Sequence, residues 1–172
     1  MQLVDVAMDV LRQHGVKHLV TVANFETEAL RHEFEIDPDL SVTGACREGE
    51  AVAIASGLVA GGERTVLCME NLGFFECLDT LRAMPRDMGI SVPMFVGYCG
   101  RGSTWDEVSI VGGMVGQRVL GGDWTEPVLD ATKIPYRVIL PETPEAEVRE
   151  ILDAALAANE PFVVLLDTFD KE

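Results

Sequence analysis

The chain has 172 residues, of which 48% are hydrophobic and 24% are charged, a composition suited to one globular domain with a sizeable core. Its 13 basic and 29 acidic residues give a net charge of −16, which argues against partners such as nucleic acid or anionic membranes. No apolar run approaches the roughly 20 residues of a membrane span, and the amphipathic N-terminus predicts a helix rather than a signal peptide.

Cysteine and histidine usage indicates neither a disulfide framework nor a zinc site. The four cysteines lack a CxxC spacing, which fits reduced thiols, and we expect a cytoplasmic protein. All three histidines lie in the first 32 residues and no HExxH motif occurs, so we expect no metal site on this chain. Cys46 would need a neighbouring base to act as a nucleophile, and we expect a buried structural thiol instead.

Strand-like and helical patterns alternate along the chain. Apolar residues at positions 3, 6, 7, 10 and 11 predict a first helix, and further helical patterns separate the β-rich runs. Six such runs are expected to be strands: 18–23, 41–45, 64–69, 92–98, 136–140 and 161–167. This alternation predicts a single α/β domain over residues 1–172, doubly wound, with a mostly parallel six-stranded sheet and helices on both faces.

A glycine-rich segment at residues 97–124 interrupts the alternation. A stretch of this length and composition is typical of a functional loop or of disorder, so we expect a long loop there. A helical pattern resumes at Thr125 and leads into the fifth expected strand.

Polar residues follow three of the expected strands, where parallel sheets bind ligands. Asn24, Glu48 and Asn71 are therefore expected to gather along one edge of the sheet. The chain has no GxGxxG after a strand, no GxxxxGK[ST] and no GxSxG, which argues against a dinucleotide site, a P-loop and a nucleophile elbow.

Glu48 stands out because it precedes a run of small apolar residues. That run predicts a helix in which Ala51, Ala55 and Ser56 would let another helix or subunit approach closely. Burial would favour the neutral, hydrogen-bond-donating form of a carboxyl group at this helix start, whereas the helix dipole favours the ionised form. The second acid, Glu50, is expected to be ordinary helix-start charge.

Three motifs carry a resemblance to a known family. The segment R-E-G-E-A-V-A-I-A-S-G at 47–57 resembles the cofactor-activating segment in the pyrimidine-binding (PYR) domain of thiamine diphosphate enzymes. M-E-N-L-G at 69–73 is similar to the family's M-Q-N-S-G, and I-P-Y recurs at 134–136. Over nearly its whole length the chain resembles sulfopyruvate decarboxylase α subunits and the PYR half of phosphonopyruvate decarboxylase.

The resemblance implies roles for individual residues. Glu48 would be the catalytic glutamate, which hydrogen-bonds the aminopyrimidine of thiamine diphosphate and so helps the cofactor lose its reactive proton. The cofactor-binding set would be Glu48, Asn71, Leu72 and Gly73, although a plain turn explains Asn-x-Gly equally well. The substrate-binding set would be Asn24, Arg101 and Arg118, although each arginine could equally be solvated.

The resemblance also implies a partner. Family members hold the diphosphate through Mg²⁺ on a second domain marked by G-D-G, which this chain lacks. We therefore expect a hetero-oligomer with a separate β-type (PP-domain) subunit that carries GDG and Mg²⁺, with the cofactor lying between the chains.

The implied function is that of the α-type subunit of a two-component decarboxylase for a small anionic 2-oxo acid, of the sulfopyruvate or phosphonopyruvate type. The segment 98–122 departs most from the relatives, which leaves the substrate open. A carboligase subunit and a non-catalytic PYR-like binding or regulatory subunit are the alternatives.

Overall fold

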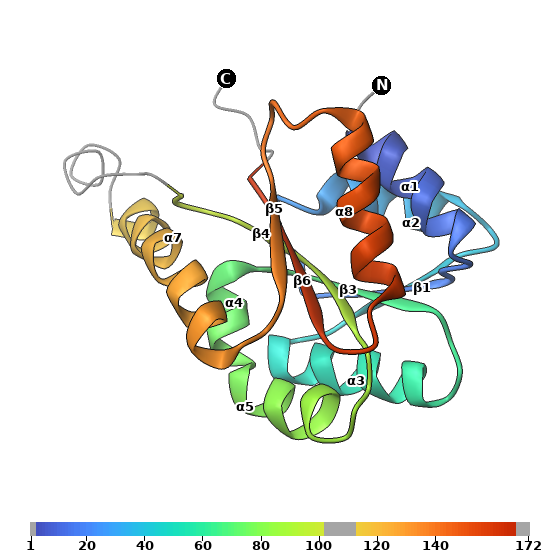
Figure 1. The fold of residues 1–172 in the computed structure, drawn as a ribbon, viewed down its shortest axis with the longest axis horizontal. Coiled ribbons are helices and arrows are strands. Elements are labelled where there is room, and N and C mark those ends of the chain that lie inside the picture. Colours follow the sequence, from blue (N-terminus) through green and yellow to red (C-terminus); the bar gives the residue numbers. More distant parts are fainter. Residues whose placement is uncertain (1–2, 102–112, 168–172) are drawn as a thin grey trace.

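A computed structural model describes residues 3–101 and 113–167, without the side chains of 113–120. The strands form one sheet in the order β2-β1-β3-β4-β6-β5, and every neighbouring pair is parallel (Figure 1). The strands are β1 (His18–Thr21), β2 (Ser41–Gly44), β3 (Thr65–Glu70), β4 (Pro93–Gly97), β5 (Tyr136–Ile139) and β6 (Phe162–Leu166). All six expected strands are thus present, and the doubly wound prediction is confirmed, with a fully parallel sheet.

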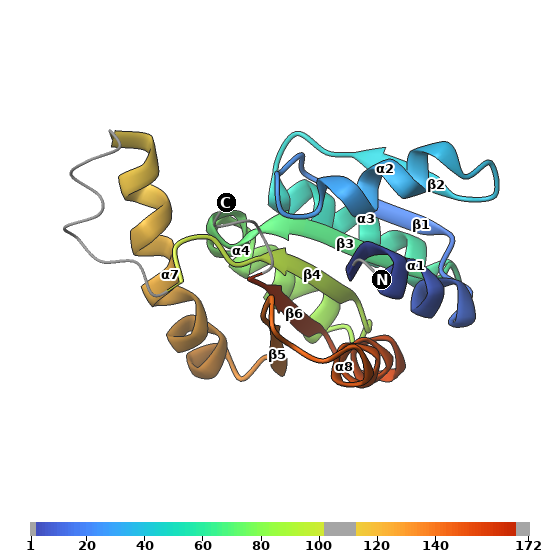
Figure 2. The same ribbon diagram turned by 90° about the horizontal axis from the view of Figure 1, so that it is seen from above.

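Helices cover both faces of the sheet (Figure 2). One face carries α1 (Leu3–Gln13), α2 (Glu28–Ile36) and α8 (Glu145–Ala157). The other carries α3 (Glu48–Ala60), α4 (Asn71–Glu76), α5 (Leu78–Leu81), the π-helical turn η1 (Arg82–Arg86) and α7 (Gly113–Thr132). Because side chains alternate across a strand, Leu19 enters one core and Val20 the other. Both clusters consist of closely packed apolar residues, which hold the strands in place.

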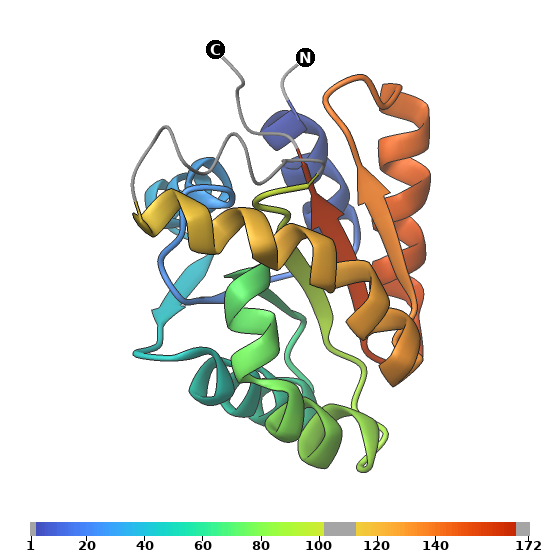
Figure 3. The same cartoon turned by 90° about the vertical axis from the view of Figure 1, so that its left-hand side faces the viewer.

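The glycine-rich segment is not the long loop that the sequence predicts. Residues 102–112 lie outside the described part of the chain, but helix α7 begins at Gly113, so the second half of 97–124 is helical. Figure 3 shows α7 lying alongside α4. The prediction was wrong there because glycine lowers helix propensity on average, while in α7 two glycines serve close packing.

Gly121 and Gly122 let α7 approach its neighbours at backbone distance. A Cβ atom at Gly121 would overlap the side chain of Leu72 in α4. A Cβ atom at Gly122 would overlap the carbonyl group of Gly100 and lie 2.6 Å from the backbone nitrogen of Arg101. Further along α7, the Glu126 carboxylate accepts hydrogen bonds from the tyrosine hydroxyl groups of the β4–α7 connection and of β5 (2.8 and 3.2 Å). These contacts fix α7 against the carboxyl-terminal edge of the sheet.

Replacing Gly122 with alanine should therefore destabilise the protein. The obstructing atoms belong to backbone, which cannot rotate away, so we expect a loss of about 1–3 kcal/mol in the free energy of unfolding. Urea denaturation measures this loss. Gly57→Ala is the matched control, because a Cβ atom there meets nothing within 4 Å. Equal stability of the two variants would contradict the close approach of α7.

The small residues of α3 are used inside the chain. Ala51, Ala55 and Ser56 are fully buried against the core, and the Ser56 hydroxyl donates to the Val52 carbonyl (2.7 Å). Of the two expected neighbours, another helix or a subunit, the structure shows helices of the same chain, because α3 contacts α4, α5 and η1 as well as the sheet. The period of the small residues matches the face of α3 that turns toward the sheet, which sequence alone could not distinguish from an intersubunit face.

Cysteines differ sharply in their surroundings. Cys46 is exposed, contrary to expectation, because it lies in the connection before α3 rather than under it. Cys68 and Cys77 are buried, and burial raises the pKa of the Cys68 thiol to about 12. Burial, together with the carboxylates of Glu76 and Glu48, raises the pKa of the Cys77 thiol to about 12 as well.

These two thiols predict a loss of stability at alkaline pH. Their folded-state pKa values are raised above the unfolded value near 9, so their contribution is complete below pH 9 and is lost as pH rises toward 12. Between these pH values, each thiol can lower the free energy of unfolding by up to about 1.4 kcal/mol per pH unit. The test is urea denaturation under reducing conditions at pH 8 and pH 10. The free energy of unfolding should decrease less between these pH values in the double variant Cys68→Ala/Cys77→Ala than in the unmodified chain. The same decrease in both would contradict the assignment.

Within the described ranges, the model has no helix of sufficient length and hydrophobicity to cross a membrane.

Candidate functional site at the carboxyl edge of the sheet

The carboxyl ends of the parallel strands carry the expected polar residues. Helix α3 begins at Glu48, four residues after β2 ends, and α4 begins at Asn71 directly after β3. The neighbouring β1 and β4 end at the same edge because the pairs are parallel and in register. Segments distant in sequence therefore meet here, as is usual for ligand sites in doubly wound folds.

Glu48 occupies the first turn of α3 and is half buried. Its side chain lies directly on the α-carbon of Gly73 in α4, since a Cβ atom at Gly73 would overlap the Glu48 carboxyl group. None of the hydrogen bonds and ion pairs among the described residues involves the Glu48 carboxylate. The structure thus brings together two of the expected cofactor residues, and it leaves the glutamate oxygens available to a ligand.

The other acids near Glu48 have structural partners. Glu50 accepts a hydrogen bond from the backbone N–H of Cys46 (2.8 Å), reaching back over the helix start as in a capping box. Glu76 accepts the backbone N–H of Gly49 (2.8 Å) and lies 4.0 Å from Arg47. The expectation that Glu50 is helix-start charge agrees with this geometry, and Glu48 differs from both neighbours in having no such partner among the described residues.

Asn71, Leu72 and Gly73 form the first turn of α4 rather than a loop that closes β3. The Asn71 side chain is fully buried, and its Nδ2 donates to the Cys99 carbonyl (2.9 Å) and to the Thr125 hydroxyl (3.0 Å). Leu72 packs on α7 at Gly121. The amide of Asn71 therefore ties α4 to α7, and of these three residues it is Gly73 that contacts Glu48.

The expected substrate residues are dispersed. Asn24 structures its own loop, because its Nδ2 donates to the Val22 carbonyl and its Oδ1 accepts from the backbone and hydroxyl of Thr27 (2.9, 3.0 and 3.0 Å). Arg101 is partly exposed, 3.3 Å from Asp167, and its guanidinium lies 6.0 Å from the centre of the Tyr98 ring. Arg118 belongs to α7, but its side chain lies outside the described residues.

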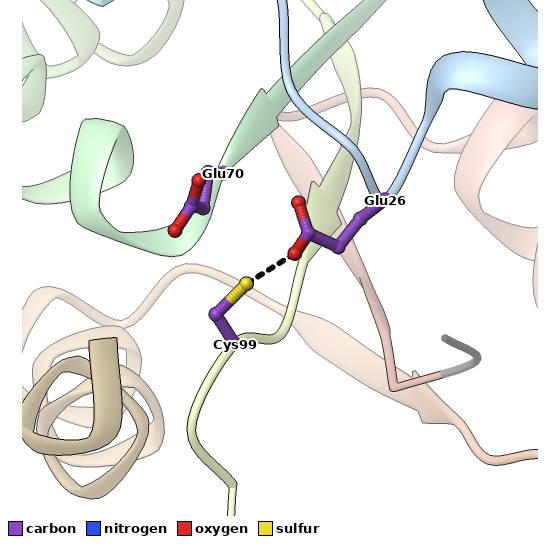
Figure 4. Close-up of side chains that lie close together, drawn as sticks. All are labelled: Glu26, Glu70 and Cys99. Atoms are coloured by element: carbon purple, nitrogen blue, oxygen red, sulfur yellow. Dashed lines mark hydrogen bonds between the residues drawn. The ribbon is translucent and has the colours of Figure 1, made fainter. Parts of the chain in front are cut away.

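A cluster that sequence reasoning missed lies at the same edge, formed by Glu26, Glu70 and Cys99 (Figure 4). Glu26 follows β1, Glu70 ends β3, and Cys99 follows β4. Their carboxylate and sulfur atoms all lie within 4.8 Å of one another. One signal was present in the sequence, since Glu70 replaces the glutamine of the family's M-Q-N-S-G motif.

Comparison with known proteins places this geometry in context. No protein-family model matches the chain. Sulfopyruvate decarboxylase subunit alpha of Methanococcus maripaludis is 25% identical over 168 residues, which cover 96% of this chain and 89% of that protein. The subunit of the same name from Methanocaldococcus jannaschii is 24% identical over 136 residues, covering 78% of this chain and 73% of that one.

Solved structures share the fold. Benzoylformate decarboxylase from Polynucleobacter necessarius superposes with a TM-score of 0.63 at 17% identity, covering 99% of this chain and 31% of that one. The thiamine diphosphate-dependent 4-hydroxybenzoylformate decarboxylase of Rhodococcus jostii gives a TM-score of 0.65 at 14% identity, covering 98% and 30%. The chain therefore spans about a third of each solved structure. The resemblance to sulfopyruvate decarboxylase α subunits and to the PYR fold of thiamine diphosphate enzymes is confirmed.

Proposed function

We propose that this relative of sulfopyruvate decarboxylase α subunits is itself the α-type subunit of a two-component thiamine diphosphate-dependent decarboxylase. Its substrate is a small anionic 2-oxo acid of the sulfopyruvate or phosphonopyruvate type. The proposal is supported by the names and extent of the two relatives and by the shared fold.

The observation that carries the proposal is the placement of Glu48. Its carboxylate has no hydrogen-bond or ion-pair partner in the described part of the chain, yet its position is fixed by contact with Gly73. A glutamate that is packed on a glycine and has available oxygens suits a hydrogen bond to the aminopyrimidine ring of thiamine diphosphate. Glu48 would hold a proton at the N1′ atom of that ring, and the α4 backbone at Gly73 would keep the carboxyl group in place.

Thiamine diphosphate, when bound, supplies the electron sink that decarboxylation of a 2-oxo acid requires. This chain contributes the orientation of one end of the cofactor and a proton-handling group. The diphosphate and its Mg²⁺ are assigned to a separate β-type subunit that carries a GDG motif, because the present chain has none. The proposal therefore requires a hetero-oligomer with the cofactor between the two chains.

Substrate recognition draws on few positive charges of this chain. Arg101, four residues after β4 ends, is one basic residue that could meet an anionic group, and it already pairs with Asp167. Glu26 and Glu70 would repel a substrate anion unless their charge is neutralised. We therefore assign part of the substrate's charge recognition to the β-type subunit.

To test the proposal, the chain is produced together with a GDG-containing companion subunit. The pair is then assayed in the presence of thiamine diphosphate and Mg²⁺. Carbon dioxide release is measured with sulfopyruvate, phosphonopyruvate, and uncharged-tail aliphatic and aromatic 2-oxo acids. Preference for an anionic tail would support the assignment. A product in which the decarboxylated substrate is joined to an added aldehyde, in place of its own free aldehyde, would favour the carboligase alternative. Cofactor binding without turnover of any 2-oxo acid would favour the regulatory one.

A further inference from the structure

We propose that Glu26, Glu70 and Cys99 form a binding site for one divalent transition-metal ion, of which Zn²⁺ is the best match. The site lies on this chain alone and is distinct from the Mg²⁺ expected on the partner. It does not depend on the proposed function, because all three residues belong to this chain: Glu70 ends β3, and Glu26 and Cys99 lie in the connections that follow β1 and β4.

Three side chains from different elements converge on one point (Figure 4). The Glu26 carboxylate points toward both Glu70 and Cys99, and the Cys99 thiol contacts its Oε1 atom. Tight strand pairing sets the separation, since Glu70 pairs with Gly97, two residues before Cys99. Strand pairing therefore fixes Glu70 relative to the start of the connection that carries Cys99, which helps to preorganise a metal site.

Glu26 provides independent support for a ligand. Glu26 is only 8% exposed, and its Oε2 atom is buried without a hydrogen-bond partner among the described residues. None of the ion pairs in the described ranges includes Glu26. A buried carboxylate oxygen in this state costs free energy unless a proton or a cation completes its surroundings.

The backbone makes room for this buried acid. A Cβ atom at Gly97 would lie 2.5 Å from Glu26 Cβ and 2.6 Å from Glu26 Cγ. Gly97 is the last residue of the central strand β4, and a glycine in a strand often marks a place where another group approaches closely. The fold thus accepts a glycine in β4 in order to admit the Glu26 side chain.

The donor set indicates the kind of metal. Two carboxylates and one thiol combine hard and soft ligands, which suits borderline ions such as Zn²⁺ better than Mg²⁺ or Ca²⁺. In tetrahedral geometry, zinc bonds of about 2.0–2.3 Å place two ligand atoms about 3.3–3.8 Å apart, so ligand atoms within 4.8 Å of one another must move closer by up to about 1.5 Å when the metal binds. Binding would release the Cys99 proton to solvent and leave the thiolate on the metal.

Three protein ligands leave the fourth tetrahedral position open, as in catalytic rather than structural zinc sites. A bound divalent cation would also lower the negative charge of the cluster, because its two positive charges outweigh the one negative charge that Cys99 gains as a thiolate, and it would so weaken the repulsion of an anion at this edge. The expectation of no metal site rested on histidine positions, and this cluster contains no histidine.

Metal titration of the purified full-length chain, stripped with a chelator, tests the proposal. Zn²⁺ affinity is measured by competition with a chromophoric chelator, and Co²⁺ serves as a spectroscopic probe for a thiolate ligand. We expect one Zn²⁺ per chain and a near-ultraviolet thiolate-to-Co²⁺ charge-transfer band. Glu26→Gln should weaken Zn²⁺ binding at least about tenfold. Its melting temperature without metal should not fall, because the substitution removes a buried charge.

Cys99→Ser should abolish the Co²⁺ band, whereas Cys46→Ser, which alters the exposed cysteine, should leave the band intact. The proposal is overturned if the chain binds no Zn²⁺ saturably, or if the band survives Cys99→Ser. It is equally overturned if Glu26→Gln binds Zn²⁺ as tightly as the unmodified chain, in which case the cluster holds a proton instead.

Discussion

Replacing Glu48 with glutamine is expected to lower the decarboxylation rate of the reconstituted two-subunit enzyme by about 10²- to 10⁴-fold. Glutamine keeps the shape of the side chain but has no proton to exchange with the cofactor ring. Glu48 lies on Gly73 without a hydrogen-bond or ion-pair partner among the described residues, so the substitution breaks no such interaction within that part of the chain. The folded state should therefore survive, and thermal unfolding should occur at a similar temperature.

Glu50→Gln is the matched control for this substitution. Glu50 is two residues away on the same helix start, and its carboxylate caps the backbone at Cys46. Its replacement should cost some helix-start stability, on the order of 0.5–1 kcal/mol, and leave the catalytic rate nearly unchanged. A similar loss of rate in both variants would mean that charge at this helix end, and not the position of Glu48, governs activity.

Gly73→Ala should reduce the catalytic rate by about 10²-fold or more without unfolding the chain. The added methyl group would occupy the space of the Glu48 carboxyl group, so the Glu48 side chain must rotate away from its position. Alanine is favoured over glycine within a helix by up to about 1 kcal/mol, which offsets part of the strain in α4. Steady-state kinetics and thermal unfolding on the same preparation separate the two effects.

Gly57→Ala in α3 serves as the control for that change, because the space around its Cβ position is open. This variant should keep full activity and gain slightly in stability. Full activity of Gly73→Ala would show that the contact between α4 and Glu48 does not position the carboxyl group, and the assignment of Gly73 would then be wrong.

The strands could be predicted from sequence because each is a short apolar run between helical patterns, and parallel pairing follows from that alternation. The part of helix α7 before Thr125 could not, since Gly121 and Gly122 satisfy the usual criteria for a loop. These glycines are needed for tertiary packing, because Gly121 lies against Leu72 and Gly122 lies against the backbone of Gly100. Propensity describes an isolated segment, and here packing against α4 and the β4 connection overrides it.

The site was predictable to the extent that its chemistry is carried by a motif. The spacing around Glu48 and the glycine of M-E-N-L-G pointed to the two residues that the structure brings into contact. Asn71 also has a structural contact that the sequence could not reveal, because its amide donates to Thr125, which lies far along the chain. Glu26, Glu70 and Cys99 share no motif spacing, since parallel strand order alone brings them together.

The central claim is that Glu48 activates the cofactor. It is tested most directly by the rate of hydrogen–deuterium exchange at C2 of thiamine diphosphate bound to the reconstituted pair of subunits. This measurement requires no substrate, so it separates the role of Glu48 from the identity of the 2-oxo acid. The account predicts exchange at least about 10²-fold faster with the unmodified chain than with Glu48→Gln, at equal cofactor occupancy. Equal exchange rates in the two preparations would contradict the assignment of Glu48 as the group that activates the cofactor.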